Sequence, residues 1–210
     1  MVTMSMNRVI HAAFRRDLQR FVDALANVHD GDRTRAAQLG TAWDNFDAQL
    51  TTHHEGEHEI AWPSLRRIGV SQETLDQMDA EHDRMAEALT ETRAAMAAYR
   101  MSGAAADAAT ARAAFERLQG VTVEHLDHEE REIEGTYLEH AESPEMKEMG
   151  KQFAKVSPAT GGTFFAWLTD GAGPAERAAL DESVPKPVQK IIGGLFGRRY
   201  RREVASVWRA

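Results

Sequence analysis

The sequence contains no cysteine among its 210 residues. Disulfide bonds, thiolate metal sites and iron–sulfur ligation are therefore excluded. The chain also lacks an uninterrupted apolar run of about 18 residues, the length that a membrane-spanning helix requires. Its first ten residues are short and mixed in character and do not have the pattern of a secretory signal. We therefore expect a cytoplasmic protein without a transmembrane segment.

No segment of useful length alternates apolar and polar residues with the period of a β-strand. Apolar residues instead recur at spacings of three and four in four long segments. Turn signals separate these segments at residues 30–32, 69–71, 102–107 and 143–144. The sequence predicts an all-α protein, with an up-down-up-down four-helix bundle over residues 1–142 and a C-terminal helical extension over residues 143–210.

Two copies of the pattern His-x-x-x-Glu stand out, one formed by His53 and Glu57 and the other by His125 and Glu129. Residues four apart project from the same face of a helix, so each copy presents an imidazole and a carboxylate to a common point. Nitrogen and carboxylate donors together suit iron, manganese or zinc. Two such helices facing each other predict a metal site with two carboxylates in it.

Two further histidines, His11 and His82, lie on the helical segments that precede the two patterns. All four histidines fall on the apolar stripe of their segment, and they alternate between early and late positions in successive segments. In an antiparallel bundle this alternation places them near the same end, where two buried carboxylates require a cation. The predicted dinuclear metal site has six ligands, namely His11, His53, Glu57, His82, His125 and Glu129.

His54 and His58 are also four residues apart and compete with the first pattern for the role of ligand. Their helix face is less apolar than the face of His53, so we predict that they lie around the metal and do not bind it. His128, next to a predicted ligand, has the same status. His54, His58 or His128 would act as a proton relay, a reserve ligand or a hydrogen-bond partner of the ligands.

These motifs resemble those of a known family. The histidine at position 11, the stretch from His53 to Pro63, the segment around His82 and the stretch from His125 to Glu132 resemble the signatures of hemerythrin-like proteins with an HHE cation-binding domain. The resemblance covers roughly residues 7–140. It implies two non-haem iron ions with carboxylate bridges and an oxo or hydroxo bridge, with His125 as a terminal ligand and Glu129 as a bridge.

One departure from the family concerns Ala86. The oxygen-carrying hemerythrins have a fifth histidine four residues after the histidine that His82 matches, and this chain has Ala86 there. The predicted site then has four imidazoles and an open coordination position, where catalytic metals bind small ligands. We therefore expect a di-iron oxidoreductase that disproportionates hydrogen peroxide, as a catalase does.

Two other classes of function stay open at this point. One is a non-enzymatic sensor, carrier or store for oxygen, nitric oxide or iron. The other is nitric oxide reduction or iron donation for the repair of metal centres, both associated with the wider family. The predicted ligands are common to all of these functions. Manganese and zinc also suit the donors, and the resemblance is what favours iron.

The extension is predicted to contain short helices at residues 145–156, 158–168, 174–180 and 185–195. Its apolar cluster, Phe164, Phe165, Trp167 and Leu168, has three interpretations: ordinary packing, control of access to the iron, or a contact within a homodimer. From Lys186 to Arg209 the tail has a net charge of +6, against −8 for the whole chain. We expect this basic tail to pair with acidic residues of the bundle and not with nucleic acid.

Overall fold

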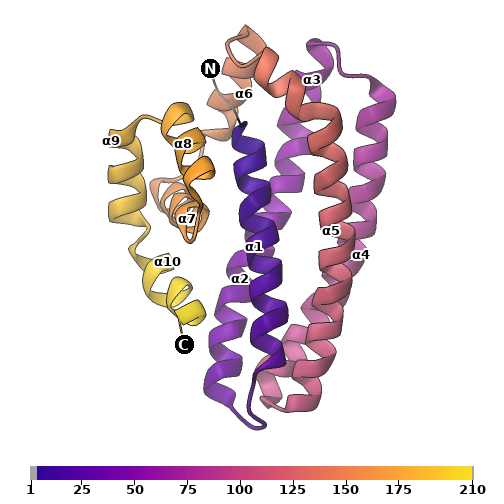
Figure 1. Cartoon of the computed structure of the whole chain (residues 1–210), viewed down its shortest axis with the longest axis vertical. Coiled ribbons are helices and arrows are strands. Elements are labelled where there is room, and N and C mark those ends of the chain that lie inside the picture. The colour runs from indigo at the N-terminus through magenta and orange to yellow at the C-terminus, as the bar shows by residue number, and fades with distance from the viewer. Residues whose placement is uncertain (1–3, 210) are drawn as a thin grey trace.

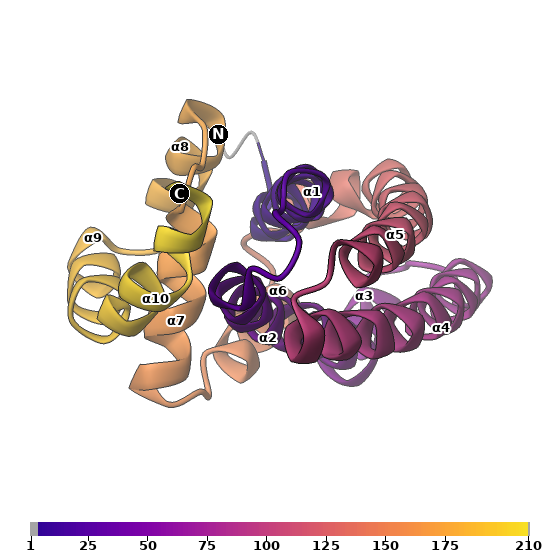
Figure 2. The same ribbon diagram turned by 90° about the horizontal axis from the view of Figure 1, so that it is seen from below.

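The computed structural model describes residues 4–209, and within them every regular element is helical. The bundle consists of α1 (Met6–Ala26), α2 (Arg33–Gly56), α4 (Gln72–Ser102) and α5 (Ala105–Glu139). Successive long helices run in opposite directions, with α4 packed along α2 and α5 and with α1 packed along α5 (Figures 1 and 2). The prediction of an all-α, up-down-up-down bundle with further C-terminal helices is confirmed.

Glycines with positive φ reverse the chain between the long helices. Gly31, Gly69 and Gly103 have φ values of 78°, 105° and 67°, a region that glycine enters without the steric cost of a Cβ atom. Asp32 and Ser71 then begin α2 and α4 by accepting hydrogen bonds from backbone N–H groups of the first turn. The predicted turn signals therefore mark the ends of these helices.

The end of α2 is irregular, because five residues, Glu57–Ala61, form a π-helix before α3 (Trp62–Arg67) begins. Pro63 has no backbone N–H, and the N–H of Trp62 bonds the carbonyl of Glu57, five residues earlier. A π-turn adds a residue to the helix and rotates every later side chain relative to the earlier ones. Ala61 and Leu65 are consequently buried.

Short helices make up the extension. They are α6 (Pro144–Phe153), α7 (Pro158–Thr169), α8 (Pro174–Ser183), α9 (Lys186–Val188), the π-helix Gln189–Phe196, α10 (Arg198–Glu203) and a 3₁₀ turn, Ala205–Arg209. Helices occur at all four places where the sequence predicts them. The helix α6 packs against α3 at one end of the bundle, and the later helices lie beside α1 and α2 (Figures 1 and 2).

The apolar cluster of α7 packs against the bundle. Trp167 and Leu168 are fully buried in the same core as the bundle aromatics, and Phe164 and Phe165 are partly buried against it. The ring of Trp167 lies 5.0 Å from that of Phe14, measured between centroids. Ordinary packing is therefore the interpretation that applies to this cluster.

A buried carboxylate of α1 also anchors the extension. The indole N–H of Trp167 donates to Asp17 Oδ2 at 2.7 Å, and Arg16 Nε donates to Asp17 Oδ1 at 2.8 Å. Arg20 joins Asp17 to Asp170 at the end of α7, at 3.1 and 3.0 Å. Because the core and these polar contacts run across residue 143, the division into units 1–142 and 143–210 stays a prediction. Residues 1–3 and 210 of those units lie outside the described residues.

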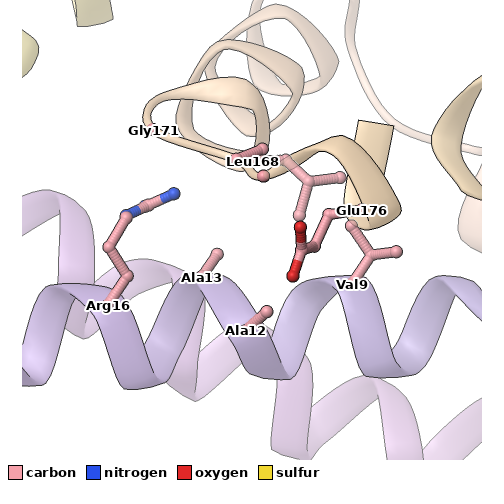
Figure 3. A pocket seen from close by; sticks show the side chains of 9 residues that line it. Val9, Ala12, Ala13, Arg16, Leu168, Gly171 and Glu176 are labelled. Atoms are coloured by element: carbon pink, nitrogen blue, oxygen red, sulfur yellow. The ribbon is translucent and has the colours of Figure 1, made fainter. Parts of the chain in front are cut away.

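A small cavity remains between α1 and the connection from α7 to α8 (Figure 3). Its volume is about 60 Å³, and its lining includes Val9, Ala13, Arg16, Leu168 and Glu176. Such a volume accommodates very few water molecules. The cavity is lined by none of the predicted metal ligands, so we assign it no role in the site.

The predicted pairing of the basic tail with the bundle is wrong for the described residues. Arg199 and Arg202 both pair with Glu203 of the tail itself, and Lys186 pairs with Asp181 of α8. No ion pair recorded for residues 186–209 reaches an acidic residue of the bundle. Neighbours within a helix turn are closer than partners on another helix, which favours local pairs. Across residues 4–209, no helix combines the length and apolar character needed to cross a membrane.

Candidate metal centre

The structure brings the six predicted ligands together inside the bundle. His11, Glu57, His125 and Glu129 are at most 2% exposed, and the side chains of His53 and His82 are 8% and 11% exposed. These residues come from α1, α2, the π-helix, α4 and α5, so every long helix contributes. As predicted, the alternation of early and late positions along successive helices brings these side chains close together.

The ligand atoms fall into two groups, and within each group all atoms lie within 4.8 Å of one another. The first group is His11, His53, Glu57 and Glu129, and the second group is His54, Glu57, His82 and His125. Glu57 belongs to both. Its Oε1 lies 3.1 Å from His53 Nε2, whereas its Oε2 lies 3.3 Å from His82 Nε2. One carboxylate therefore presents one oxygen to each group, which is the arrangement of a bridging ligand.

Several buried polar atoms of the two groups have no hydrogen-bond partner. They are Nε2 of His11, His53 and His54, both carboxylate oxygens of Glu57, and Oε2 of Glu129. His11 Nε2 and Glu129 Oε2 lie 3.1 Å apart without the geometry of a hydrogen bond. A buried polar atom without a partner costs about 1–3 kcal/mol, so six at one place need a common explanation. Imidazole nitrogens and carboxylate oxygens that face a shared space fit a divalent or trivalent cation.

Carboxylates outside the two groups orient the imidazoles. Glu130 Oε1 lies 3.0 Å from His11 Nδ1, and Glu81 Oε2 lies 2.9 Å from His125 Nδ1. When Nδ1–H donates to a carboxylate, the lone pair of Nε2 is directed toward the cluster. Glu81 and Glu130 were not predicted from the sequence, although each is adjacent to a predicted ligand.

Most imidazoles of the cluster are in the neutral form that binds a metal. Burial lowers the pKa of His53 and His54 well below the ordinary value. Burial, and then repulsion from His125, lowers the pKa of His82 to about 4. His11 is different: burial opposes its charge, but the nearby Glu129 carboxylate outweighs this and raises the pKa of His11. Burial also lowers the pKa of His125. Four of the five histidines of the two groups, all except His11, therefore offer a lone pair near neutral pH.

The two carboxylates have opposite pKa shifts. Burial raises the pKa of Glu57 well above its ordinary value, and the negative charge of Glu129 raises it further. Burial alone would raise the pKa of Glu129 as well, but attraction to His11 lowers it to about 2. The side-chain N–H of Asn7 also donates to Glu129 Oε1 at 2.9 Å. Without a cation, the pair therefore retains a proton on Glu57, and a bound metal would replace that proton.

His54 lies in a place that the sequence did not predict. The structure puts it in the second group of ligand atoms, where its ring stacks on that of His82 with centroids 4.3 Å apart. The prediction treated residues 39–60 as one straight helix, whereas the π-turn rotates the residues that follow Gly56. Ala61 and Leu65, on the face assigned to His54, are buried. Pro63 was the signal in the sequence for this irregularity.

The other two histidines lie outside both groups. The side chain of His58 is 68% exposed and its Nδ1 lies 3.2 Å from Asp79. His128 is 20% exposed, and its Nδ1 lies 2.8 Å from Glu81 Oε1, so Glu81 connects it with His125. His128 and Glu81 also line a surface hollow of about 350 Å³ formed by α4 and α5. A polar path therefore leads from this hollow to the second group.

Comparison with known proteins gives one match. Residues 6–137 match the family model described as the hemerythrin HHE cation binding domain. The matched range is more than half of the chain and includes every residue of the two groups. The comparisons with curated proteins and with solved structures gave no match.

Proposed function

Because the chain belongs to the hemerythrin family of HHE cation-binding proteins, we propose that its buried cluster binds two iron ions and disproportionates hydrogen peroxide. One observation carries this proposal. Two groups of ligand atoms share Glu57, and six buried nitrogen and oxygen atoms of the two groups have no hydrogen-bond partner. This arrangement supports a dinuclear centre.

The donor set supports a metal that changes oxidation state. Imidazoles and carboxylates accept iron, manganese and zinc, but zinc has no redox chemistry. Disproportionation of hydrogen peroxide requires two electrons to be taken from one molecule and given to another. Iron bound at the cluster would supply this exchange of electrons.

The reaction also moves protons. One molecule of hydrogen peroxide loses two protons and two electrons and becomes O₂, and a second molecule gains them and becomes two molecules of water. Among the histidines predicted as relays, His128 has the contacts that support this role, because its Nδ1 faces Glu81 at the surface hollow. Glu81, whose two oxygens face His128 and the ligand His125, would hold His128 at the edge of the site, where His128 exchanges protons with the hollow. His58, bonded to Asp79 at the surface, is the weaker candidate.

Oxygen release tests the proposal. The purified protein is loaded with iron, its metal content is measured, and O₂ is recorded with an electrode after addition of hydrogen peroxide. We expect two irons per chain and rapid O₂ release. In Glu129→Ala, O₂ release should fall to the rate of buffer with the same iron. Glu124→Ala removes an exposed carboxylate of the same helix and should retain full activity.

The same measurement addresses the other functions. An iron-loaded protein that releases no O₂ contradicts the proposed enzyme. If that protein forms a lasting adduct with O₂ or nitric oxide in its visible spectrum, the function is that of a sensor or carrier. Consumption of nitric oxide with a reductant would assign nitric oxide reduction.

A further inference from the structure

We propose that His54 is a metal ligand, so that one ion of the pair is bound by two imidazoles and the other by three. This inference rests on the proposed dinuclear centre. It assigns His11 and His53 to one ion, and His54, His82 and His125 to the other, with Glu57 between them.

The position of the His54 ring supports this assignment. A ligand nitrogen of His54 lies within 4.8 Å of ligand atoms of Glu57, His82 and His125. Its ring is stacked on His82 at 4.3 Å and is perpendicular to His125 at 5.9 Å between centroids. Three imidazoles from α2, α4 and α5 therefore converge on the same side of Glu57.

The hydrogen-bonding state of His54 points to a ligand as well. Its Nε2 is buried and has no hydrogen-bond partner among the described residues. A buried core histidine normally has its ring nitrogens satisfied by protein groups. A histidine that has an unpaired buried nitrogen and lies beside two other imidazoles and a carboxylate is typical of a metal ligand.

The backbone explains how adjacent residues serve different ions. Successive residues of an α-helix point about 100° apart, so His53 and His54 diverge from the same turn. Glu57 is the first residue of the π-helix that follows α2. Its backbone N–H donates to the carbonyls of both His53 and His54. Its Oε1 faces His53, and its Oε2 faces His82 beside His54. Each oxygen of the Glu57 carboxylate therefore lies on the side of a different histidine, so His53 and His54 would bind different ions.

This assignment also balances the ligands of the two ions. Ala86 is exposed on α4 and supplies no ligand, yet His54 gives the ion near His82 a third imidazole. The ion near His11 and His53 has two imidazoles and a second carboxylate, Glu129. With Glu57 shared between them, each ion then has four protein residues as ligands.

Metal binding by the variant His54→Ala tests the assignment without relying on turnover. Iron(II) is titrated anaerobically against a chelator, and the ⁵⁷Fe-loaded protein is studied by Mössbauer spectroscopy. We expect the wild-type protein to bind two ions that give two distinct signals. In His54→Ala, one ion should bind at least about tenfold more weakly and only one signal should change. His29→Ala, which removes an exposed histidine of the loop between α1 and α2, is the control and should match the wild type.

The outcomes separate this inference from the proposed function. If the wild-type protein binds fewer than two ions, the dinuclear centre itself fails. If it binds two, and His54→Ala binds both with unchanged affinity and signals, the inference is wrong while the centre stands. Equal weakening of both ions also contradicts it, because His54 then supports the site without belonging to one ion. Circular dichroism of the metal-free variant checks folding, and His54→Gln replaces His54→Ala if the latter does not fold.

Discussion

At the scale of single residues, the metal-free cluster has one carboxyl group in an unfavourable environment. Burial and the charge of Glu129 together raise the pKa of Glu57 above the ordinary 4.5. Above about pH 4.5 the folded protein therefore holds a proton that the unfolded chain has released. The contribution of Glu57 to the free energy of unfolding of the metal-free protein therefore falls as pH rises from there toward the folded pKa of Glu57.

The variant Glu57→Gln removes this pH dependence, because the amide has the size of the protonated carboxyl group and does not ionise. In a chelator, we expect Glu57→Gln to gain stability over the wild type as pH rises from about 5 to about 7.5, by at most about 1.4 kcal/mol per pH unit. Urea denaturation of both proteins at the two pH values measures the difference.

The matched control is Glu59→Gln, which changes an exposed carboxyl group of the same π-helix. Its stability difference from the wild type should be the same at both pH values. If the free energy of unfolding of Glu57→Gln instead falls relative to the wild type as pH rises, Glu57 is ionised in the metal-free protein.

The clustering of the six predicted ligands could be predicted from the sequence because it depends only on helical periodicity and on the alternating direction of the helices. The position of His54 could not, because its helix face was judged partly from Ala61 and Leu65, and the π-turn rotates these later residues relative to a regular helix. Glu81 and Glu130 were missed for another reason. They act across helices on His125 and His11, and a contact between flexible side chains of different helices has no signature in spacing.

At the scale of elements, Asp17 joins α1 to α7. Its carboxylate is 3% exposed and accepts from the indole of Trp167 and from Arg16 and Arg20. Removal of this carboxylate would leave Arg16 without its counter-charge, while Arg20 would keep Asp170. The attachment of the extension to the bundle therefore depends on this residue as well as on apolar packing.

We expect Asp17→Ala to lower the free energy of unfolding by about 3 kcal/mol, because it leaves the Trp167 N–H and the Arg16 guanidinium without their acceptor and leaves Arg20 with Asp170 alone. Thermal and urea denaturation of the metal-free variant measure the loss. Asp23→Ala removes an exposed carboxylate of the same helix and should change stability by less than about 0.5 kcal/mol. Equal stability of the two variants would contradict the anchoring role of Asp17.

The ends of the long helices were predictable because glycine and capping residues act locally. Gly31, Gly69 and Gly103 lie in the predicted turns and adopt the positive φ that favours glycine. The π-helix was not predicted, since Pro63 alone does not specify whether a helix kinks, ends or widens. The partners of the basic tail were also missed, because charge totals carry no information on distance.

At the scale of the whole molecule, bundle and extension share one core. Trp167 covers Phe14, whose ring lies 5.2 Å from His53, and Trp208 lies 5.0 Å from Phe21. Arg35 of α2 donates to the carbonyl of residue 207. The extension therefore covers bundle aromatics from Phe14, beside the candidate metal site, to Phe21, nearer the turn between α1 and α2.

Removal of residues 143–210 should expose this apolar surface. We expect the fragment 1–142 to unfold at a lower temperature than the full chain and to bind a hydrophobic dye or aggregate, because Phe14 and Phe21 lose their cover. Calorimetry and dye fluorescence compare the two. A monomeric fragment with the stability of the full chain would instead establish residues 1–142 as an independent domain.

The ligands of the cluster lie far apart along the chain, on every long helix, in a protein that has no cysteine. Metal bound to them would act as a reversible cross-link that closes several long loops at once and so reduces the conformational entropy of the unfolded chain. The metal would stabilise the part of the bundle around the cluster, while packing of the aromatic core stabilises the rest. If the metal is the iron of the proposed function, its supply or withdrawal would determine how long the protein survives proteases that attack the unfolded chain, and the abundance of the protein would follow the availability of iron.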